Sequence, residues 1–149
     1  MKLRFVILLL FLSVFAIACA KSSNNLVWLE DYNQALKQST ESKLPILINF
    51  TGSDWCIWCK RLSEEVFDTK EFENYAKKNL ILLKIDFPQK IAQTEQVKNS
   101  NRALAQKYQV QGFPTIVLTD SKGNIINVTG YQKGGASAYI DHLKSLLKK

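Results

Sequence analysis

The chain has 149 residues, of which 20 are Lys or Arg and 13 are Asp or Glu, and its formal net charge is +7 at pH 7. This length suits one ordinary domain with a real core. The lysines are scattered without a basic stripe, which argues against nucleic-acid binding, and the chain has no internal repeat and no long linker.

The first twenty residues are predicted to be a secretory signal peptide. Lys2 and Arg4 precede an apolar stretch over 5–18, which is shorter than the roughly 20 residues of a membrane-spanning helix. Small residues at 18 and 20 fit a cleavage site, so residues 21–149 are expected to form a single exported domain. Without Lys2 and Arg4, 18 basic residues stand against 13 acidic ones, a net charge of about +5.

Cys19 leaves a second kind of processing open. The stretch 15–19 also resembles a bacterial lipoprotein signal, in which cleavage before the cysteine leaves Cys19 lipidated and the domain anchored to a membrane. Such signals usually have Leu, Val or Ile where this chain has Ala16, so simple cleavage after Ala20 is favoured. Either route predicts an exported, periplasmic protein.

Hydrophobic periodicity predicts alternating helices and strands up to residue 87. Leu29, Tyr32 and Leu36 recur at helical spacing, whereas 44–50 is a continuous apolar run typical of a strand buried on both faces. The segment 68–71 resembles a capping box with Asp68 as its N-cap. In chain order, we expect a helix over about 28–38, a strand over 44–50, helices over about 57–66 and 69–78, and a strand over 80–87.

The C-terminal half is predicted to hold a hairpin between two helices. Residues 88–99 are polar and are predicted to be a loop, and the composition of 120–124 is that of a turn. The order of elements predicts an α/β fold, a central mixed β-sheet flanked by helices on both faces. The elements expected here are a helix over 101–108, strands over 115–119 and 125–129, and a C-terminal helix marked by Tyr139, Ile140, Leu143, Leu146 and Leu147.

Cys56 and Cys59 lie two residues apart where a predicted strand gives way to a helix. A helix N-terminus carries partial positive charge and unpaired N–H groups, which favour the reactive thiolate over the thiol. The second sulfur is close enough to attack a mixed disulfide formed by the first. A bridge across so short a loop contributes little stability, so reversible dithiol–disulfide chemistry is favoured over a purely structural disulfide.

Metal binding and haem attachment are the alternatives for this cysteine pair. Structural zinc takes four ligands, and the exported domain offers only Cys56, Cys59 and His142 as thiol or imidazole ligands. Haem attachment needs a histidine directly after the second cysteine, where this chain has Lys60. We therefore expect neither a metal nor an organic cofactor.

The residues around the pair resemble the thioredoxin superfamily. The similarity rests on Trp-Cys-x-x-Cys-Lys at 55–60 after a buried strand and on Gly-Phe-Pro-Thr at 112–115 before a later one. It covers about 26–147, over which the order of elements also agrees, and it implies a thioredoxin-like fold. The segment 50–59 is similar to exported bacterial thioredoxin-like proteins, which often have an aromatic residue before the second cysteine.

The resemblance implies roles for individual residues. Cys56 matches the exposed nucleophilic cysteine and Cys59 the buried resolving one. Pro114 matches a proline that the family holds in the cis form facing the disulfide, and Phe113 would border the groove in which an extended substrate segment lies. Trp55 matches the aromatic residue that flanks the disulfide.

Four further positions are left with two interpretations or depart from the family. Trp58, like the tryptophan before the pair, is either a core residue or a contact for unfolded polypeptide, and Lys60 is either a solvated charge or a cation acting on the thiols. Ile57-Trp58 replaces the Gly-Pro of thioredoxin. Asn49 falls where the family has a buried acid, and Asn cannot accept a proton as a carboxylate can.

The sequence favours an exported thiol–disulfide oxidoreductase that reduces or isomerises disulfides of extracytoplasmic proteins. A strong oxidant needs a strongly stabilised thiolate, and no feature of the sequence supplies one for Cys56. Such an enzyme needs a membrane or soluble electron donor, and we expect a monomer without nucleic-acid partners. The alternatives are a non-catalytic binding or chaperone module of the same fold, or a dedicated assembly factor for one partner.

Overall fold

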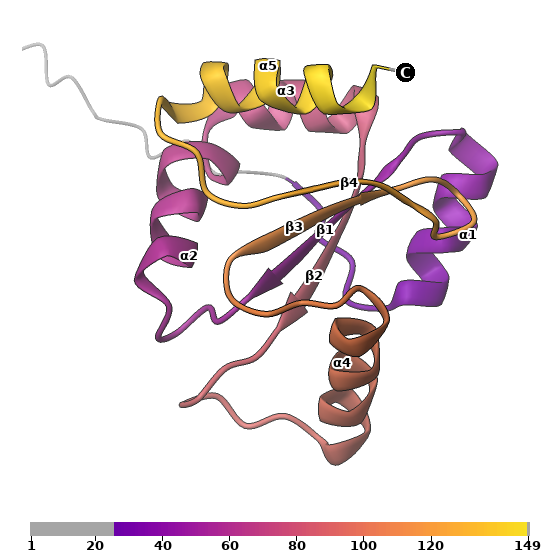
Figure 1. The fold of residues 1–149 in the computed structure, drawn as a ribbon, viewed down its shortest axis with the longest axis vertical. Coiled ribbons are helices and arrows are strands. Elements are labelled where there is room, and N and C mark those ends of the chain that lie inside the picture. Colours follow the sequence, from indigo (N-terminus) through magenta and orange to yellow (C-terminus); the bar gives the residue numbers. More distant parts are fainter. Residues whose placement is uncertain (1–25, 149) are drawn as a thin grey trace, which may run out of the picture.

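The computed structural model describes residues 26–148, so the predicted signal segment and Cys19 lie outside the described residues (Figure 1). Within 26–148, four strands form one sheet in the order β2-β1-β3-β4. β1 pairs in parallel with β2 and antiparallel with β3, and β3 pairs antiparallel with β4. The strands are β1 (Ile46–Thr51), β2 (Ile81–Asp86), β3 (Thr115–Thr119) and β4 (Ile125–Thr129). The predicted mixed sheet is confirmed.

Helices cover both faces of the sheet, as predicted. In Figure 1, α3 and α5 lie side by side above the sheet, whereas α1 and α4 lie together on its other side. No helix within 26–148 is long and apolar enough to cross a membrane. The helices are α1 (Tyr32–Ser42), α2 (Ile57–Leu62), the π-helix η1 (Ser63–Phe67), α3 (Lys70–Asn79), α4 (Glu95–Lys107) and α5 (Gly135–Leu147).

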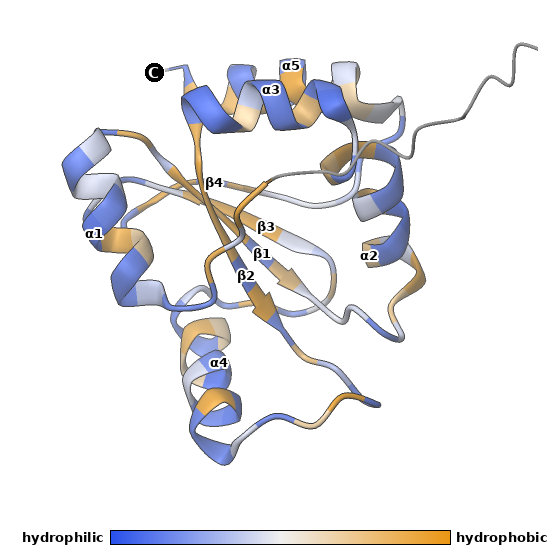
Figure 2. Ribbon diagram, turned by 180° about the vertical axis from the view of Figure 1, so that it is seen from behind, coloured by the Kyte–Doolittle hydropathy of each residue, from blue (hydrophilic) through white to orange (hydrophobic). Residues whose placement is uncertain are grey.

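Two hydrophobic cores sandwich the central strand β1, every residue of which is buried. Successive side chains of a strand point to opposite faces of a sheet. Leu47 therefore packs with α2, η1, α3 and α5, while Ile46, Ile48 and Phe50 pack with α1 and α4. Figure 2 shows the strands as a hydrophobic layer between helices whose outer sides are hydrophilic. This buried sheet fixes the position of the end of β1, and the loop that leads to the cysteine pair starts there.

The predicted start of the first helix at residue 28 is wrong. The carboxylate of Asp31 accepts a hydrogen bond from the Gln34 N–H at 2.8 Å and caps the helix, which therefore begins at Tyr32. Leu29 instead lies alongside β2, where its N–H donates to the Leu82 carbonyl at 2.9 Å. A short extended segment before the cap was thus misread as helix because its apolar residues happen to match helical spacing.

Two other expected boundaries also differ. The N-cap of α3 is Thr69, whose hydroxyl accepts from the Phe72 N–H at 3.2 Å, so the prediction of Asp68 as the cap is wrong. Asp68 instead closes the π-helix, because its N–H donates to the Ser63 carbonyl at 2.8 Å. The predicted loop 88–99 also ends earlier, since α4 begins at Glu95 with Thr94 as its cap. The first turns of α4 face solvent and have no regularly spaced apolar residues that would predict a helix.

The predicted hairpin of β3 and β4 is confirmed with the expected bounds. Its turn is held by Asp120, whose carboxylate accepts from the N–H groups of Lys122 at 2.8 Å and Asn124 at 2.9 Å. These bonds hold the pKa of Asp120 below its ordinary value, together with the bond from the Asn124 side chain, which contributes most. The turn lies at the end of β3 remote from the cysteine pair, while Pro114 precedes the other end of the strand.

Candidate active site

A disulfide joins Cys56 and Cys59 where the chain passes from β1 into α2, as the sequence predicted. Cys56 is the N-cap of α2, and Cys59 lies in its first turn, with the two Cα atoms 5.3 Å apart. The N–H of Cys56 donates to the Gly52 carbonyl at 2.9 Å, which closes the loop after β1. The pair is therefore supported by the most buried strand of the sheet.

One polar group contacts the sulfur of Cys56 directly. The backbone N–H of Cys59 donates to the Cys56 Sγ at 3.2 Å, so an unpaired donor of the helix N-terminus is aimed at this sulfur. Both cysteines are 6% exposed, whereas the resemblance implied an exposed Cys56 and a buried Cys59. In the oxidised form, only a small part of either cysteine is therefore open to solvent.

Within the described residues, the Lys60 ammonium donates no hydrogen bond to either sulfur. Its Nζ donates to the Asp54 carbonyl at 3.0 Å, on the loop before the pair. The Asp54 carboxylate accepts from the N–H groups of Gln89 at 2.9 Å and Lys90 at 2.6 Å, and these bonds hold its pKa below the ordinary value, the Gln89 bond contributing most. Asp54 thus ties the loop after β2 to the active-site loop, a role that the sequence did not reveal.

Trp55 belongs to an aromatic cluster on one side of the disulfide. Its Nε1 donates to the Phe87 carbonyl at 2.8 Å, and its ring meets Phe113 edge-on with centroids 5.9 Å apart. Phe113 in turn stacks on Phe87 at 5.1 Å. A Cβ atom at Gly52 would lie 2.5 Å from the Trp55 ring, so only glycine allows this close approach. Trp55 is held by these contacts and yet remains 40% exposed.

Trp58 belongs to a second aromatic wall, which it forms with Tyr131. It is 46% exposed, and its ring lies 5.3 Å from that of Tyr131 and 5.1 Å from the guanidinium of Arg61. The Tyr131 hydroxyl donates to Glu65 at 2.7 Å, which raises the pKa of Tyr131. A groove of about 580 Å³ lies beside this wall, lined by Trp58, Phe113, Pro114, Tyr131, Gln132 and Lys133.

The structure brings three of the residues that the sequence singled out, Trp58, Phe113 and Pro114, to one groove. Phe113 and Pro114 border the groove next to Trp58, and the Phe113–Pro114 peptide bond is cis. Tyr131 was missed, because a single tyrosine in the segment between β4 and α5 carries no pattern of its own. Its neighbours Gln132 and Lys133 were missed for the same reason. These three residues complete the groove only through the folding of the chain.

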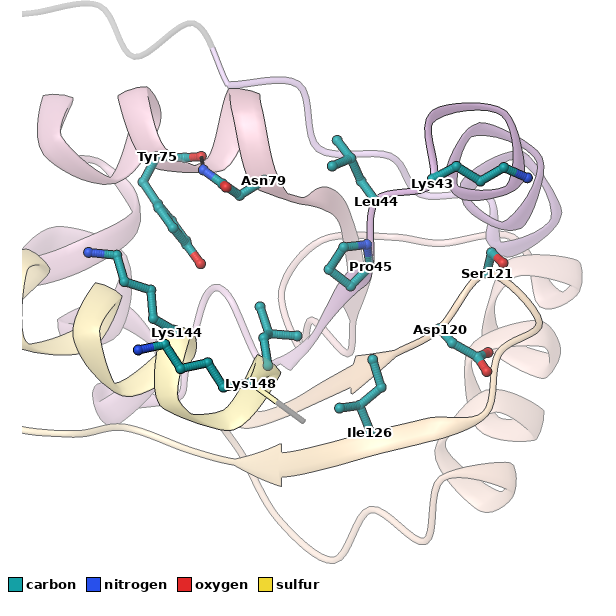
Figure 3. A pocket seen from close by; sticks show the side chains of 11 residues that line it. Lys43, Leu44, Pro45, Tyr75, Asn79, Asp120, Ser121, Ile126, Lys144 and Lys148 are labelled. Atoms are coloured by element: carbon teal, nitrogen blue, oxygen red, sulfur yellow. Dashed lines mark hydrogen bonds between the residues drawn. The ribbon is translucent and has the colours of Figure 1, made fainter.

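A pocket of about 560 Å³ lies at the opposite end of the sheet, where β1 begins and β3 ends (Figure 3). Apolar side chains such as Pro45 and Ile126 form its floor, and Lys43, Lys144 and Lys148 extend around it. It contains no cysteine or histidine. The length of β1 separates it from the disulfide, so it takes no part in the redox site.

Comparison with known proteins decides the family. The thioredoxin-like domain family matches residues 32–144. The chain belongs to this family. The disulfide bond reductase DsbH of Chlamydia pneumoniae is 40% identical to the thioredoxin-like chain over 124 residues, which are 83% of this chain and 74% of that protein. A solved DsbH oxidoreductase shares 38% identity and superposes with a TM-score of 0.79, covering 84% of this chain and 86% of the other.

Two further relatives differ more in length or sequence. The thioredoxin-related protein DsbJ of Chlamydia pneumoniae is 30% identical over 151 residues, which are 95% of this chain but 43% of that protein. The solved C-terminal domain of DsbD from Neisseria meningitidis has the same fold, with a TM-score of 0.57. The two are 17% identical, and the match covers 80% of this chain and 98% of that domain. With its Cys56–Cys59 pair intact, this thioredoxin-like protein is a thiol–disulfide oxidoreductase.

Proposed function

We propose that the protein reduces disulfide bonds of other exported proteins, with Cys56 as nucleophile and Cys59 as resolving cysteine. The observation that carries this proposal is the disulfide at the N-terminus of α2, whose two cysteines each directly follow a partly exposed tryptophan in the chain. A folded protein that needed only a structural bridge would gain little from one spanning two residues. The partly exposed aromatic rings suit contact with an extended polypeptide.

The reaction proceeds through two exchanges. In the reduced protein, the Cys56 thiolate attacks a substrate disulfide, so a bond forms between Cys56 and one substrate sulfur while the other sulfur leaves as a thiolate and takes a proton. The Cys59 thiolate then attacks the Cys56 sulfur and releases the second substrate thiol. The substrate has gained two electrons, and Cys56–Cys59 is again a disulfide. A dithiol donor must reduce it before the next cycle.

The reducing direction follows from the surroundings of Cys56. Among the described residues, its sulfur receives one backbone N–H bond, and the nearby Lys60 ammonium is bonded to a carbonyl oxygen instead. A strongly oxidising pair requires a reduced form stabilised by more than this. DsbH, to which the chain is 40% identical, is named a disulfide bond reductase, and this supports the same direction.

We assign the groove beside Trp58 to the substrate segment that flanks the attacked disulfide. The groove is apolar where Trp58, Phe113 and Pro114 line it, and Lys133 adds a positive charge at its edge. Trp58 and Tyr131 present a continuous pair of rings at 5.3 Å. An aromatic side chain next to the substrate cysteine would stack on this pair, and Phe113, whose ring also contacts Trp55, would border the same groove.

Trp58→Ala is expected to lower kcat/KM about fivefold to tenfold for a disulfide peptide with Phe beside its cysteine, because one aromatic contact and its buried area are lost. For the same peptide with Ala in place of Phe, the substitution should lower kcat/KM by less than about twofold. The matched control is Ile57→Ala, since Ile57 is 67% exposed and borders no described groove. Equal losses for both peptides would show that Trp58 does not select the substrate.

We also assign export to residues 1–20, the predicted signal peptide, which leaves 21–149 as a single domain. Extracytoplasmic substrates with misplaced disulfides and a membrane or soluble dithiol donor are then the partners. Cleavage after Ala20 remains our preferred processing. The mass of the protein secreted from a bacterial host tests it, because a lipidated Cys19 would add the mass of its acyl chains to the N-terminus.

A single-turnover experiment tests the proposal. The reduced protein is mixed with insulin in the absence of other thiols. The insulin disulfides that are lost and the Cys56–Cys59 pairs that become oxidised are then counted. We expect one insulin disulfide to be lost for each Cys56–Cys59 pair that becomes oxidised. If the pair stays reduced while insulin is intact, and the oxidised protein instead oxidises a dithiol peptide, the direction that we propose is wrong.

A further inference from the structure

A second, polar pocket lies behind the disulfide, on the side of Cys59. Its volume is about 180 Å³, and it opens between the edge of β1 and β2 and the helices α2 and η1. Water fits such a space, because a polar cavity needs far less volume to hold one molecule. The lining residues used below are Asn49, Cys59, Ser63, Glu64, Asp68 and Lys84.

Asn49 lines this pocket and has an amide oxygen that is unpaired within 26–148. Its side chain is 8% exposed, and its Oδ1 has no hydrogen-bond partner among the described residues. A buried carbonyl oxygen left unpaired costs about 1–3 kcal/mol, so such groups are normally bonded to ordered water. The pocket onto which Cys59 opens is lined by Asn49 and by other polar residues, and it has the room and the polar groups that ordered water needs.

The chemistry of Cys59 requires a proton acceptor in this place. To resolve the mixed disulfide, Cys59 must lose its proton, and a thiol in an apolar, buried setting gives up its proton less readily than one in water. Cys59 is 6% exposed. Asn49 accepts no proton itself, whereas the carboxylates of Glu64 and Asp68, which line the same pocket, can accept one.

The π-helix brings Asp68 to the side of the helix that carries Cys59. Ser63 lies one α-helical turn after Cys59, and the bond from the Asp68 N–H to the Ser63 carbonyl closes a wider turn of five residues. All three residues consequently line the pocket. Asp68 is exposed on its outer side, but its partial burial, and to a lesser extent the nearby Glu64 carboxylate, raise its pKa and make it a stronger base than an ordinary aspartate.

The other charged groups at this pocket are engaged elsewhere. The Lys84 Nζ pairs with Glu30 at 3.2 Å, and the Lys60 Nζ donates to a backbone carbonyl. Asp86 accepts from the N–H and hydroxyl of Ser53, which also lines the pocket. Within 26–148, neither the Asp68 nor the Glu64 carboxylate accepts a hydrogen bond. Of the two we select Asp68, because its own backbone N–H closes the π-helix and fixes its place beside the pocket.

We propose that water in the pocket behind the disulfide carries the proton of Cys59 to the carboxylate of Asp68. The step converts the Cys59 thiol and the Asp68 carboxylate into a thiolate and a carboxylic acid. The thiolate then forms its bond to the Cys56 sulfur, and the substrate sulfur leaves with the electron pair and is protonated by solvent. This inference rests on the proposed function, because it concerns the second exchange of that reaction.

The test isolates the second exchange. The reduced protein is mixed at acid pH with dithiobis-nitrobenzoate, an aromatic disulfide that labels Cys56 and releases one coloured thiolate. A jump in pH then starts the attack by Cys59, which releases the second. We expect Asp68→Asn to slow this second release about tenfold at neutral pH and to match the unmodified protein at alkaline pH, where hydroxide takes the proton directly.

Two variants complete the design. Glu71→Gln, an exposed acid of α3 outside the pocket, should leave the pH profile unchanged. Adding Asn49→Asp to Asp68→Asn should restore the neutral rate, because the new carboxylate lies in the same pocket. A profile of Asp68→Asn that superimposes on that of the unmodified protein, or that is lowered equally at every pH, would overturn the inference. Absence of the first release would instead contradict the proposed function.

Discussion

Cys56→Ser is expected to reduce disulfide turnover to background, whereas Cys59→Ser is expected to stop the reaction after one covalent step. Serine cannot replace the thiolate that attacks the substrate, so the first variant forms no adduct. The second variant retains the nucleophile but cannot resolve the mixed disulfide, which should accumulate. Insulin reduction measures turnover, and mass spectrometry without reducing agent detects the adduct.

The two variants also separate the enzyme from a non-catalytic binding module of the same fold. Both proteins should remain folded, because the bridge spans two residues and contributes little stability. If Cys56→Ser kept the full biological effect of the protein, a binding or assembly role through the groove would replace the catalytic account. Comparable adduct yields from both variants would contradict the assignment of Cys56 as the nucleophile.

Phe67→Ala is expected to cost about 3–5 kcal/mol in the free energy of unfolding, the range for a buried aromatic truncated to alanine. Phe67 is 2% exposed and lies at the end of η1. Its ring contacts those of Trp28 at 5.2 Å, Phe72 at 4.9 Å and Tyr139 at 6.1 Å, and so joins α3 and α5 to the N-terminal segment. Urea denaturation measures the loss.

The matched control for this variant is Ile57→Ala at the start of α2. Ile57 is 67% exposed, so its truncation should change the stability by no more than about 0.5 kcal/mol. A loss below about 1 kcal/mol for Phe67→Ala would mean that the core on this face of the sheet rearranges to fill the space. The packing described for η1, and with it the position of Asp68, would then need revision.

The strands were the most predictable elements of this fold. Residues 115–119 and 125–129 match β3 and β4 because their apolar content and the turn at 120–124 are local signals. Helix ends were harder, since the caps of α1 and α3 are single side chains, Asp31 and Thr69. Thr69 follows Asp68, which could serve as well, and Asp31 follows an extended segment whose apolar residues match helical spacing. The first turns of α4 have no regularly spaced apolar residues, because they face solvent.

The redox pair could be predicted from its motif, but its surroundings could not. Cys56 and Cys59 are two residues apart in the chain, so their pairing needs no knowledge of the fold. Tyr131 and Asp68 reach the two sides of the pair through tertiary structure alone, in the second case through a π-helix that no sequence pattern indicates. Asn49 was recognised as a departure from the family, but the polar pocket beside it was not.

The reduction potential of the Cys56–Cys59 pair tests the central claim most directly. The protein is equilibrated with glutathione or dithiothreitol redox buffers, and the oxidised fraction is measured after acid quenching and alkylation. A reductase whose Cys56 sulfur receives one backbone N–H bond should have a potential near the roughly −270 mV of thioredoxin. A value near −120 mV, roughly that of the strongest oxidants of this fold, would contradict the account and make the protein a donor of disulfides.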